Sequence, residues 1–236
     1  MYGSQSNQNY NLNQLLAALP PSAYARLAPQ LEIVRLDFKQ VLYEPKQQIV
    51  YVYFPLNSLI SLFTVMGNTA AEVGMIGNEG MLGLAVFLES NVTPFRAIVQ
   101  IPGEAMRMKA DVFKQMVNQI SSLSCLLHRY TYTLIIEIAQ SAACNSYHTV
   151  EQRCCRWLLM MHDTAKSDFF LITQDFLSQM LGVRRASVTE VAGKLQKAEL
   201  ISYSRGQMQI VDRTGLEAAA CECYALVKSE FERLFG

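Results

Sequence analysis

The period of the hydrophobic pattern changes once along the chain. Between Leu31 and Met108, apolar residues occur in short runs rich in β-branched and aromatic side chains, with prolines and glycines between the runs. Such runs are typical of short strands and predict a β-sandwich or barrel. The runs are IVRLDF, QVLYEP, QQIVYVYFPL, SLISLFTV, AAEVGMIG, FRAIVQIP and EAMRM. Before them, LNQLLAALPPSAYARLAPQ predicts one or two short helices with Pro20 and Pro21 between them.

Helical periodicity begins after Lys109. Apolar side chains then recur at alternating steps of four and three residues, a heptad spacing that predicts a coiled-coil dimer helix. The members of this predicted seam are Met116, Ile120, Leu123, Leu127, Tyr130 and Leu134. The alternative is that the stripe packs on the chain's own barrel. The small residues of AQSAAC follow, and a break is expected at Asn145 and Ser146.

The following segment has the pattern of a helix-turn-helix. A helix over about residues 150–164 carries Trp157, and the polar joint AKSDFF follows it. Thr173 is then a suitable N-cap for QDFLSQML, Gly182 is a turn residue, and RRASVTEVAGKLQKA predicts a second helix. The apolar contacts between the two helices are expected from Leu177, Leu181, Val183, Val188, Val191 and Leu195.

A β-hairpin is predicted directly after the second helix. The alternating segments LISYS and QMQIV are joined by Arg205 and Gly206, and the glycine can supply the positive φ that a tight turn needs. A helix-turn-helix followed by a hairpin is a winged helix. Asp212 is then expected to cap one final amphipathic helix, TGLEAAACECYALVKSEFERLF.

Composition describes an ordinary soluble protein. The 236 residues suffice for one large or two small domains, and 51% of them are apolar while 17% are charged. No apolar run is long enough to span a bilayer, so no membrane association is expected. The polar segment MYGSQSNQNYNLNQ lacks the features of a secretory signal. It predicts a short disordered lead-in and a cytoplasmic location.

The six cysteines are expected to be reduced thiols, because the chain shows no export signal. Arginines flank the vicinal pair Cys154 and Cys155 and could lower a thiol pKa, but buried packing on the Trp157 helix is the favoured interpretation. Cys144 and His148, four residues apart, are the best candidate pair for a metal ion. Because the sequence contains no C-x-x-C and its histidines are scattered, buried packing is favoured here too, and no metal site is predicted.

Two adjacent arginines at the start of the second helix suggest the function. A helix N-terminus already favours anions, so cations placed there indicate a negatively charged ligand. In a helix-turn-helix these residues face the major groove, where arginine binds guanine O6 and N7. Nine cations against six anions between Arg153 and Arg213 give a small local excess that would support salt-dependent DNA binding by a dimer. The alternative is that Arg184 and Arg185 form a solvated helix start.

The order of these parts resembles the Crp/Fnr (cyclic-AMP receptor protein) family of transcriptional regulators over essentially the whole chain. The most specific match is ITQDFLSQMLGVRRASVTEVAGKLQKAELIS, and GNEGMLGLAVFLESNVTPFRAIVQIPGEAMRM is a looser one. The resemblance implies an α+β fold with three parts: a cupin-like double-stranded β-helix sensor, similar to a cyclic-nucleotide-binding domain, in residues 1–118; a long dimerisation helix in 119–146; and a winged helix-turn-helix in 147–236. It further implies a homodimer on an inverted-repeat operator, with RNA polymerase as a further partner.

The resemblance also implies which residues contact DNA. Arg185 matches the family's first base-reading arginine, whereas Ala186 replaces a common acidic residue and Glu190 replaces a later arginine. Glu190 could accept from cytosine N4 and Ala186 could touch a thymine methyl, so the operator is expected to differ from that of the cyclic-AMP receptor protein. The full predicted set is Thr173, Arg184, Arg185, Ala186, Ser187, Thr189, Glu190, Lys194 and Arg205. Contacts to phosphates or sugars are expected from Thr173, Arg184, Ser187 and Lys194.

The sensor stretch departs from the family. Cyclic-nucleotide members hold the ribose with Gly-Glu and the phosphate with an arginine followed by Ser or Thr and then Ala. This chain has Glu79-Gly80 in reversed order, and its phosphate arginine is either replaced by Thr93 or supplied by Arg96 after a shift of three residues. Pro94 has no N–H to donate. Cyclic AMP is therefore not expected to bind, no cofactor is predicted, and the effector is unknown. The candidate effector residues are Glu79, Gly80, Met81, Thr93, Arg96 and Ala97.

Three classes of function follow from the sequence. The first is a DNA-binding dimer switched by an unidentified signal. The second is a dimer that is constitutive or regulated by a partner protein, which a filled barrel would favour and a polar cavity would oppose. The residues expected to fill the barrel are Tyr51, Tyr53, Phe54, Leu62 and Phe63. The third, an enzyme on the barrel, needs metal-binding histidines, and the barrel stretch has none. A non-enzymatic protein is expected, and because no cysteine precedes Cys125, an N-terminal iron–sulfur cluster is not.

Overall fold

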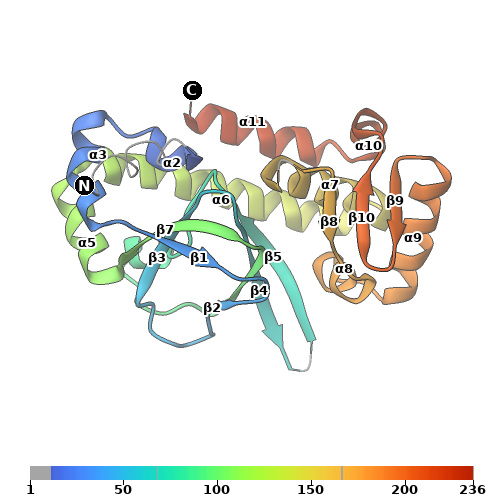
Figure 1. Cartoon of the computed structure of the whole chain (residues 1–236), viewed down its shortest axis with the longest axis horizontal. Coiled ribbons are helices and arrows are strands. Elements are labelled where there is room, and N and C mark those ends of the chain that lie inside the picture. Colours follow the sequence, from blue (N-terminus) through green and yellow to red (C-terminus); the bar gives the residue numbers. More distant parts are fainter. Residues whose placement is uncertain (1–11, 68, 166, 236) are drawn as a thin grey trace. The chain divides into compact units, whose positions relative to one another are not determined.

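The structure is a computed structural model that describes residues 12–67, 69–165 and 167–235 (Figure 1). These residues form two compact units. Unit 1 comprises residues 12–64, 74–136 and 230–235, and unit 2 comprises the described residues of 65–73 and 137–229. No helix in the described ranges is long and apolar enough to cross a membrane.

Unit 1 begins with two short helices, α2 (Gln14–Ala17) and α3 (Pro21–Leu27), and the 3₁₀ turn η2 (Ala28–Gln30). One or two short helices with Pro20 and Pro21 between them were predicted; two form, and Pro20 lies between them while Pro21 is the first residue of α3. Residues 1–11 of the predicted lead-in lie outside the described residues, but the prediction of disorder is wrong at Asn13. This fully buried side chain caps α2 by accepting from Leu16 N at 3.0 Å and donates to Pro55 O and Gly80 O at 2.9 Å each.

The predicted strands of unit 1 are confirmed, because each apolar run contains one. They are β1 (Glu32–Leu36), β2 (Val41–Tyr43), β3 (Tyr51–Pro55), β4 (Leu59–Met66), β5 (Thr69–Ile76), β6 (Arg96–Ile101) and β7 (Gly103–Lys109). They form sheets of order β1-β7-β3 and β2-β6-β4-β5, with the short helix α4 (Leu84–Phe87) before β6. The fold is therefore the mixed α+β class that the sequence predicts.

Aromatic and aliphatic side chains fill the interior of unit 1. Phe54 is fully buried and its ring lies 6.3 Å from that of Phe113 in an edge-on arrangement. Tyr53 and Phe63 are also buried, and Tyr51 packs against the same core with partial exposure. Leu62, the remaining residue expected to fill the barrel, likewise packs against this core. The described interior is therefore built from the chain's own apolar residues.

The long helical region is divided in two. Helix α5 (Ala110–Gln119) ends at Ile120, which has extended backbone angles, and α6 (Ser121–Tyr147) follows. Met116 thus lies on a different helix from the rest of the predicted coiled-coil seam. Four other members of the predicted seam are at most 4% exposed and belong to the core of unit 1: Ile120, Leu123, Leu127 and Tyr130. The last member, Leu134, is partly buried and packs against this core. The predicted dimer seam is wrong on this face, because the stripe covers the chain's own sheets.

The opposite face of α6 is exposed and has the same heptad spacing. We call it the outer seam; its members are Cys125, His128, Tyr132, Ile135, Ala139, Ala142 and Ser146. Tyr132 and Ile135 are 55% and 59% exposed, which is unusual for large apolar side chains on one helix face. The predicted break at Asn145 and Ser146 is displaced, because α6 continues to Tyr147.

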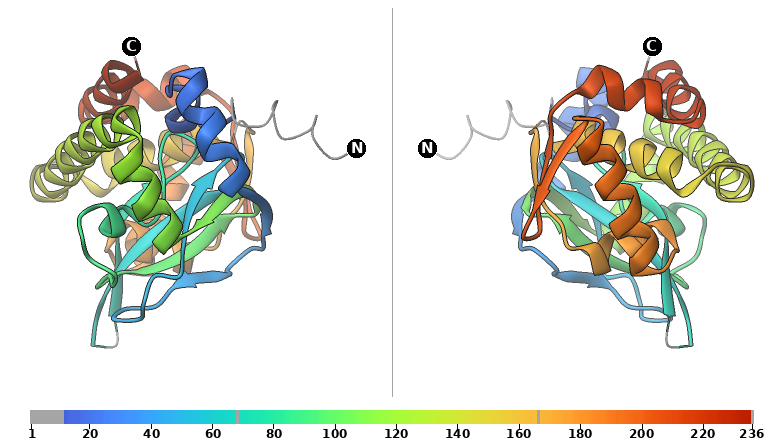
Figure 2. Two further views of the ribbon diagram at one scale, coloured as in Figure 1. Left: turned by 90° about the vertical axis from the view of Figure 1, so that its left-hand side faces the viewer. Right: turned by 90° about the vertical axis from the view of Figure 1, so that its right-hand side faces the viewer.

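Unit 2 holds the winged helix-turn-helix. Its elements are α7 (Val150–Ala165), β8 (Phe169–Leu171), α8 (Gln174–Leu181), α9 (Arg185–Lys197), β9 (Ile201–Ser204) and β10 (Gln207–Ile210). The strands form a sheet of order β8-β10-β9, and α9 lies beside its hairpin (Figure 2). Strand β8 was not predicted, because three residues are too few to show an alternating pattern. Phe169 and Phe170 were expected in a polar joint instead.

The predicted final helix is also two helices. Asp212 caps α10 (Arg213–Ala219) by accepting from Gly215 N at 2.9 Å, as expected, but the backbone becomes extended at Ala220 and α11 (Cys223–Phe235) starts anew. The last residues of α11 belong to unit 1, where Leu234 is buried in the core and its carbonyl accepts from Arg129. The winged-helix domain therefore does not extend to residue 236 as predicted.

A polar network joins α7, α10 and α11 within unit 2. The guanidinium of Arg213 donates to Asp163 and to the Tyr224 hydroxyl at 2.7 Å each, and it pairs with Glu217 at 3.0 Å. The Tyr224 hydroxyl in turn donates to Asp163 at 2.6 Å. Burial raises the pKa of Tyr224, as does its hydrogen bond to Asp163. The network fixes the first turn of α11 against α7.

Substituting Gly80 tests how unit 1 is packed. A Cβ atom at Gly80 would lie 2.1 Å from the Tyr130 hydroxyl oxygen, so Gly80→Ala has to displace a buried ring. We expect it to lower the free energy of unfolding by about 1–3 kcal/mol, the usual cost of overpacking. The matched control is Gly74→Ala, because nothing lies within 4 Å of a Cβ there. Equal urea midpoints for the two variants would contradict the packing of Tyr130 on Gly80.

Candidate DNA-binding site

The helix-turn-helix is formed as the sequence predicts. The Thr173 hydroxyl accepts from Phe176 N at 3.2 Å and so begins α8. Gly182 ends α8 at a φ of 63°, a left-handed conformation that glycine adopts without strain. Arg184 is the N-cap residue of α9. Of the six residues expected to form the apolar contacts between α8 and α9, Val183 is partly buried. The other five are buried: Leu177, Leu181, Val188, Val191 and Leu195.

The predicted DNA-contact residues fall on two surfaces of unit 2. Thr173, Arg185, Thr189 and Arg205 line an open groove of about 600 Å³ together with Gln174, Gln196 and Tyr203. The other predicted residues do not line this groove: Arg184, Ala186, Ser187, Glu190 and Lys194. They are exposed along α9 or at its start, except Ser187, which is partly exposed.

The wing contributes a tight turn beside this groove. Arg205 and Gly206 have φ values of 50° and 79°. Two successive positive φ angles are what a two-residue hairpin turn of type I′ requires. The sequence analysis assigned a positive φ to the glycine alone. The turn leaves the Arg205 side chain exposed on the groove formed by α8 and α9.

Arg185 is held loosely at the first turn of α9. Its Nη1 lies 3.4 Å from Asp175 Oδ1 and its Nε donates to Gln174 Oε1 at 3.5 Å. The Arg185 side chain is 64% exposed. Such exposed pairs contribute only about 0–1 kcal/mol, so the guanidinium is free to exchange them for a guanine edge.

Gln174 is a site residue that the sequence analysis missed. Its Oε1 also accepts from the Thr189 hydroxyl at 2.9 Å, so one amide contacts two residues of α9. The position was visible only as the residue after the Thr173 cap. That the first turn of α8 lies against the first turn of α9 follows from the three-dimensional packing and not from the spacing of apolar residues.

Glu190 and Lys194 pair with each other on the exposed face of α9. Lys194 Nζ lies 2.9 Å from Glu190 Oε1 across one helical turn. The hydrogen bond to Glu190 raises the pKa of Lys194. The predicted base contact of Glu190 and the predicted phosphate contact of Lys194 therefore each require this surface pair to open.

The candidate effector residues Glu79, Gly80 and Met81 already contact other residues of the chain. The Met81 N–H donates to the Tyr130 hydroxyl at 3.2 Å, and the Tyr130 ring packs on Gly80. Glu79 Oε1 accepts from Gly77 N at 2.7 Å. Burial raises the pKa of Glu79. Helix α6 thus covers the segment at which the resemblance places the ribose.

The candidate effector residues Thr93, Arg96 and Ala97 are also held by contacts or burial within the chain. Arg96 Nε lies 2.9 Å from Glu44 Oε2, so the candidate phosphate arginine carries a counter-ion already. The Thr93 hydroxyl accepts from Phe95 N at 3.2 Å, and Ala97 is fully buried in β6. A cyclic phosphate would have to replace the Glu44 carboxylate at Arg96.

The vicinal pair Cys154 and Cys155 lies inside α7 and is buried. Burial raises the pKa of the Cys154 thiol and raises that of Cys155 to about 12. The flanking arginines therefore do not activate these thiols, and buried packing, the favoured interpretation of the sequence, is confirmed.

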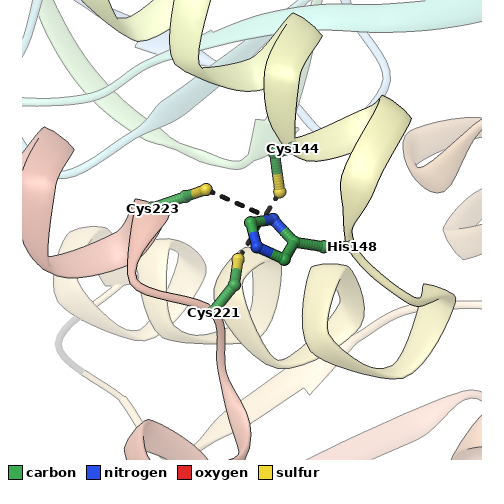
Figure 3. Close-up of side chains that lie close together, drawn as sticks. All are labelled: Cys144, His148, Cys221 and Cys223. Atoms are coloured by element: carbon green, nitrogen blue, oxygen red, sulfur yellow. Dashed lines mark hydrogen bonds between the residues drawn. The ribbon is translucent and has the colours of Figure 1, made fainter.

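Three other cysteines and a histidine come together elsewhere in unit 2. Cys144, His148, Cys221 and Cys223 place their ligand atoms within 4.8 Å of one another (Figure 3). From the sequence, Cys144 with His148 was the best candidate pair, and buried packing was favoured. The break at Ala220, which was not predicted, brings the Cys-x-Cys segment to the end of α6.

Comparison with known proteins places the helix-turn-helix in a family. The model of the Crp-like helix-turn-helix domain matches residues 152–219, which include α8, α9 and the hairpin. No curated protein matches the chain by sequence.

Solved structures share the fold at low sequence identity. A protein from Eubacterium rectale assigned to the Crp/Fnr family of transcriptional regulators superposes with a TM-score of 0.69 at 13% identity, covering 89% of this chain and 98% of its own. FixK2 from Bradyrhizobium japonicum has a TM-score of 0.69 at 12% identity, with coverage of 81% and 98%. CLP from Xanthomonas campestris, a c-di-GMP-responsive global regulator, has a TM-score of 0.63 at 15% identity, with coverage of 82% and 100%. Residues 152–219 thus form a Crp-like helix-turn-helix domain, and the chain has the fold of the Crp/Fnr transcriptional regulators.

Proposed function

We propose that the chain is a sequence-specific transcriptional regulator that binds an inverted-repeat operator as a homodimer. The observation that carries the proposal is the exposed first turn of α9, where Arg185 shares a groove with Arg205 of the wing. An α-helix fits the major groove of B-DNA, and its first residues then reach the base edges. The match to the Crp-like domain supports this use of α9.

Each exposed residue has a proposed role in the complex. Arg185 reads a guanine through its two donors, and Gln174 positions Arg185 and Thr189. Thr173, Arg184, Ser187, Lys194 and Arg205 contact the phosphate backbone. Thr189 in the groove and the exposed Ala186 and Glu190 outside it add to base recognition, which distinguishes this operator from that of the cyclic-AMP receptor protein.

We assign dimerisation to the outer seam of α6 in place of the buried stripe that the sequence suggested. Tyr132 and Ile135 supply exposed apolar area, and Ala139 and Ala142 allow two helix backbones to approach closely. The operator of such a dimer is expected to have half-sites about 34 Å apart, one turn of DNA.

The sensor has two candidate modes. In the first, an unidentified signal acts on unit 1; CLP, a neighbour in fold, is c-di-GMP-responsive. In the second, unit 1 binds no small molecule and the dimer is constitutive or controlled by a partner protein. The burial of Tyr53 and Phe54 in the core, with Leu62 packed against it, favours the second mode. In either mode we propose a non-enzymatic cytoplasmic protein with RNA polymerase as a further partner, on the strength of the fold.

The roles of two cations in α9 can be separated by substitution. Arg185→Ala should lose about 1–3 kcal/mol of discrimination at one guanine of each half-site. Lys194→Ala should weaken binding to all sequences alike and reduce the salt slope by about one. The measurement is fluorescence anisotropy on a panel of operator variants at several salt concentrations. Identical profiles for the two variants would refute the assignment.

The outer seam predicts a dimer that one charge can break. We expect the wild type to sediment as a dimer at micromolar concentration and Ile135→Asp to sediment as a monomer, because the substitution buries two carboxylates at the two-fold axis. Leu88→Asp is the matched control, since Leu88 is 56% exposed but lies off α6. A wild-type monomer, or a dimer that tolerates Ile135→Asp, would exclude this seam.

Cyclic nucleotides are expected not to bind. Arg96 is paired with Glu44, and an unpaired phosphate in the barrel would cost more than base stacking returns. Calorimetric titration with cyclic AMP and cyclic GMP should show no saturable heat at physiological concentrations. Micromolar binding that Arg96→Ala abolishes would show that the phosphate cradle survives in a shifted register.

A further inference from the structure

Four potential metal ligands converge at the end of α6. The last turn of α6 supplies Cys144, and His148 directly follows the helix; its backbone N–H donates to the Cys144 carbonyl at 3.0 Å, which extends the helical turn to the histidine. The α10–α11 connection supplies Cys221, and the first residue of α11 is Cys223. Figure 3 shows the three sulfur atoms arranged around the imidazole ring.

Two of the distances between ligand atoms match those around a tetrahedral ion, and all four atoms lie within 4.8 Å of one another. Cys144 Sγ lies 3.5 Å from Cys221 Sγ, and Cys223 Sγ lies 3.5 Å from His148 Nδ1. Zinc with Zn–S bonds of about 2.3 Å and a Zn–N bond of about 2.0–2.1 Å separates its tetrahedral ligands by about 3.5–3.8 Å. The sulfur separation of 3.5 Å is also well beyond the length of a disulfide bond, about 2.05 Å.

Neighbouring polar groups orient the histidine and one cysteine. His148 Nε2 lies 3.3 Å from Glu222 Oε1, so the ring presents Nδ1 to the sulfur atoms while its other nitrogen faces a carboxylate. A histidine that ligates a metal commonly donates its second N–H to such a partner. Gln140 Nε2 donates to Cys223 Sγ at 3.0 Å, a contact suited to a thiolate.

Packing alone does not explain this set. The three cysteines are at most 4% exposed, yet they lie against an imidazole, an amide donor and one another. A free cysteine can pack as a small apolar group, but packing does not require an imidazole and an amide donor beside the sulfur atoms. Cys125, on the same helix α6, is exposed and outside the cluster, so the convergence does not reflect a general excess of cysteine on α6.

We propose that Cys144, His148, Cys221 and Cys223 bind one Zn²⁺ ion per chain. Three thiols release their protons and the neutral imidazole binds through Nδ1, which leaves a site of net charge −1. With four protein ligands the site is closed, so the ion is structural and has no position for a substrate. It joins the end of α6 to the start of α11 within unit 2. This proposal does not depend on DNA binding.

The metal content of the full-length protein tests the proposal directly. Protein purified under reducing conditions from zinc-supplemented cells should contain one zinc ion per chain, as measured by inductively coupled plasma mass spectrometry. Reduced apoprotein titrated with Co²⁺ should develop the absorption of a tetrahedral cobalt–thiolate site and saturate at one equivalent. Cys144→Ser and Cys223→Ser should lose most of the bound zinc, whereas the matched control Cys125→Ser should keep one per chain.

A fourth variant probes the carboxylate beside the histidine. Glu222→Gln should retain one site but bind zinc about 10–100-fold more weakly in competition with a chelator, as expected for loss of such a partner. If a cysteine variant fails to fold, the Co²⁺ titration of the wild type still decides. Absence of stoichiometric zinc together with absence of the cobalt–thiolate spectrum would overturn the proposal. A Cys144–Cys221 disulfide in the purified protein, or iron with inorganic sulfide, would overturn it as well.

Discussion

The structure depends on the burial of one face of α6. Ile120 just before the helix and Leu123, Leu127 and Tyr130 within it lie in the core of unit 1, where burying each such side chain is worth about 1.5–3 kcal/mol. This burial fixes the rotation of the helix about its axis. The outer seam is exposed as a consequence. One rotational setting therefore determines, within unit 1, both the contact of Tyr130 with Met81 and the exposure of Tyr132 and Ile135.

Patterns of neighbouring residues in the sequence predicted the strands of unit 1 and the helix-turn-helix. Strands were found because each run has its own alternation, and the helix-turn-helix because Thr173 and Gly182 mark its ends. The face of α6 could not be predicted, since a heptad of apolar residues describes a helix partner and a sheet surface equally well. The metal ligands could not be predicted either. Cys144 and Cys221 are 77 residues apart in sequence, and only tertiary structure brings them together.

The breaks at Ile120 and Ala220 show why helix boundaries were the weakest part of the prediction. Neither position has a proline or glycine, and the sequence around Ala220 has high helix propensity. Tertiary contacts override that propensity. Tyr224, one residue into α11, is fixed by Asp163 of α7 and by Arg213 of α10, so side-chain contacts to both helices set the direction in which α11 starts. A zinc ion at Cys221 and Cys223 would stabilise the same break from its other side.

The two units differ in whether the residues at the positions that Crp/Fnr regulators use for binding are available to a ligand. In unit 2 the residues proposed to contact DNA, such as Arg185 and Lys194, are exposed and held by weak surface contacts that DNA could replace. In unit 1 the corresponding ligand positions are satisfied internally, Gly80 and Met81 by Tyr130 and Arg96 by Glu44. Binding a ligand at these positions costs the free energy of breaking contacts that the chain already makes. Because one of those contacts comes from α6 itself, a signal that displaced Tyr130 would act on the helix that also carries the outer seam.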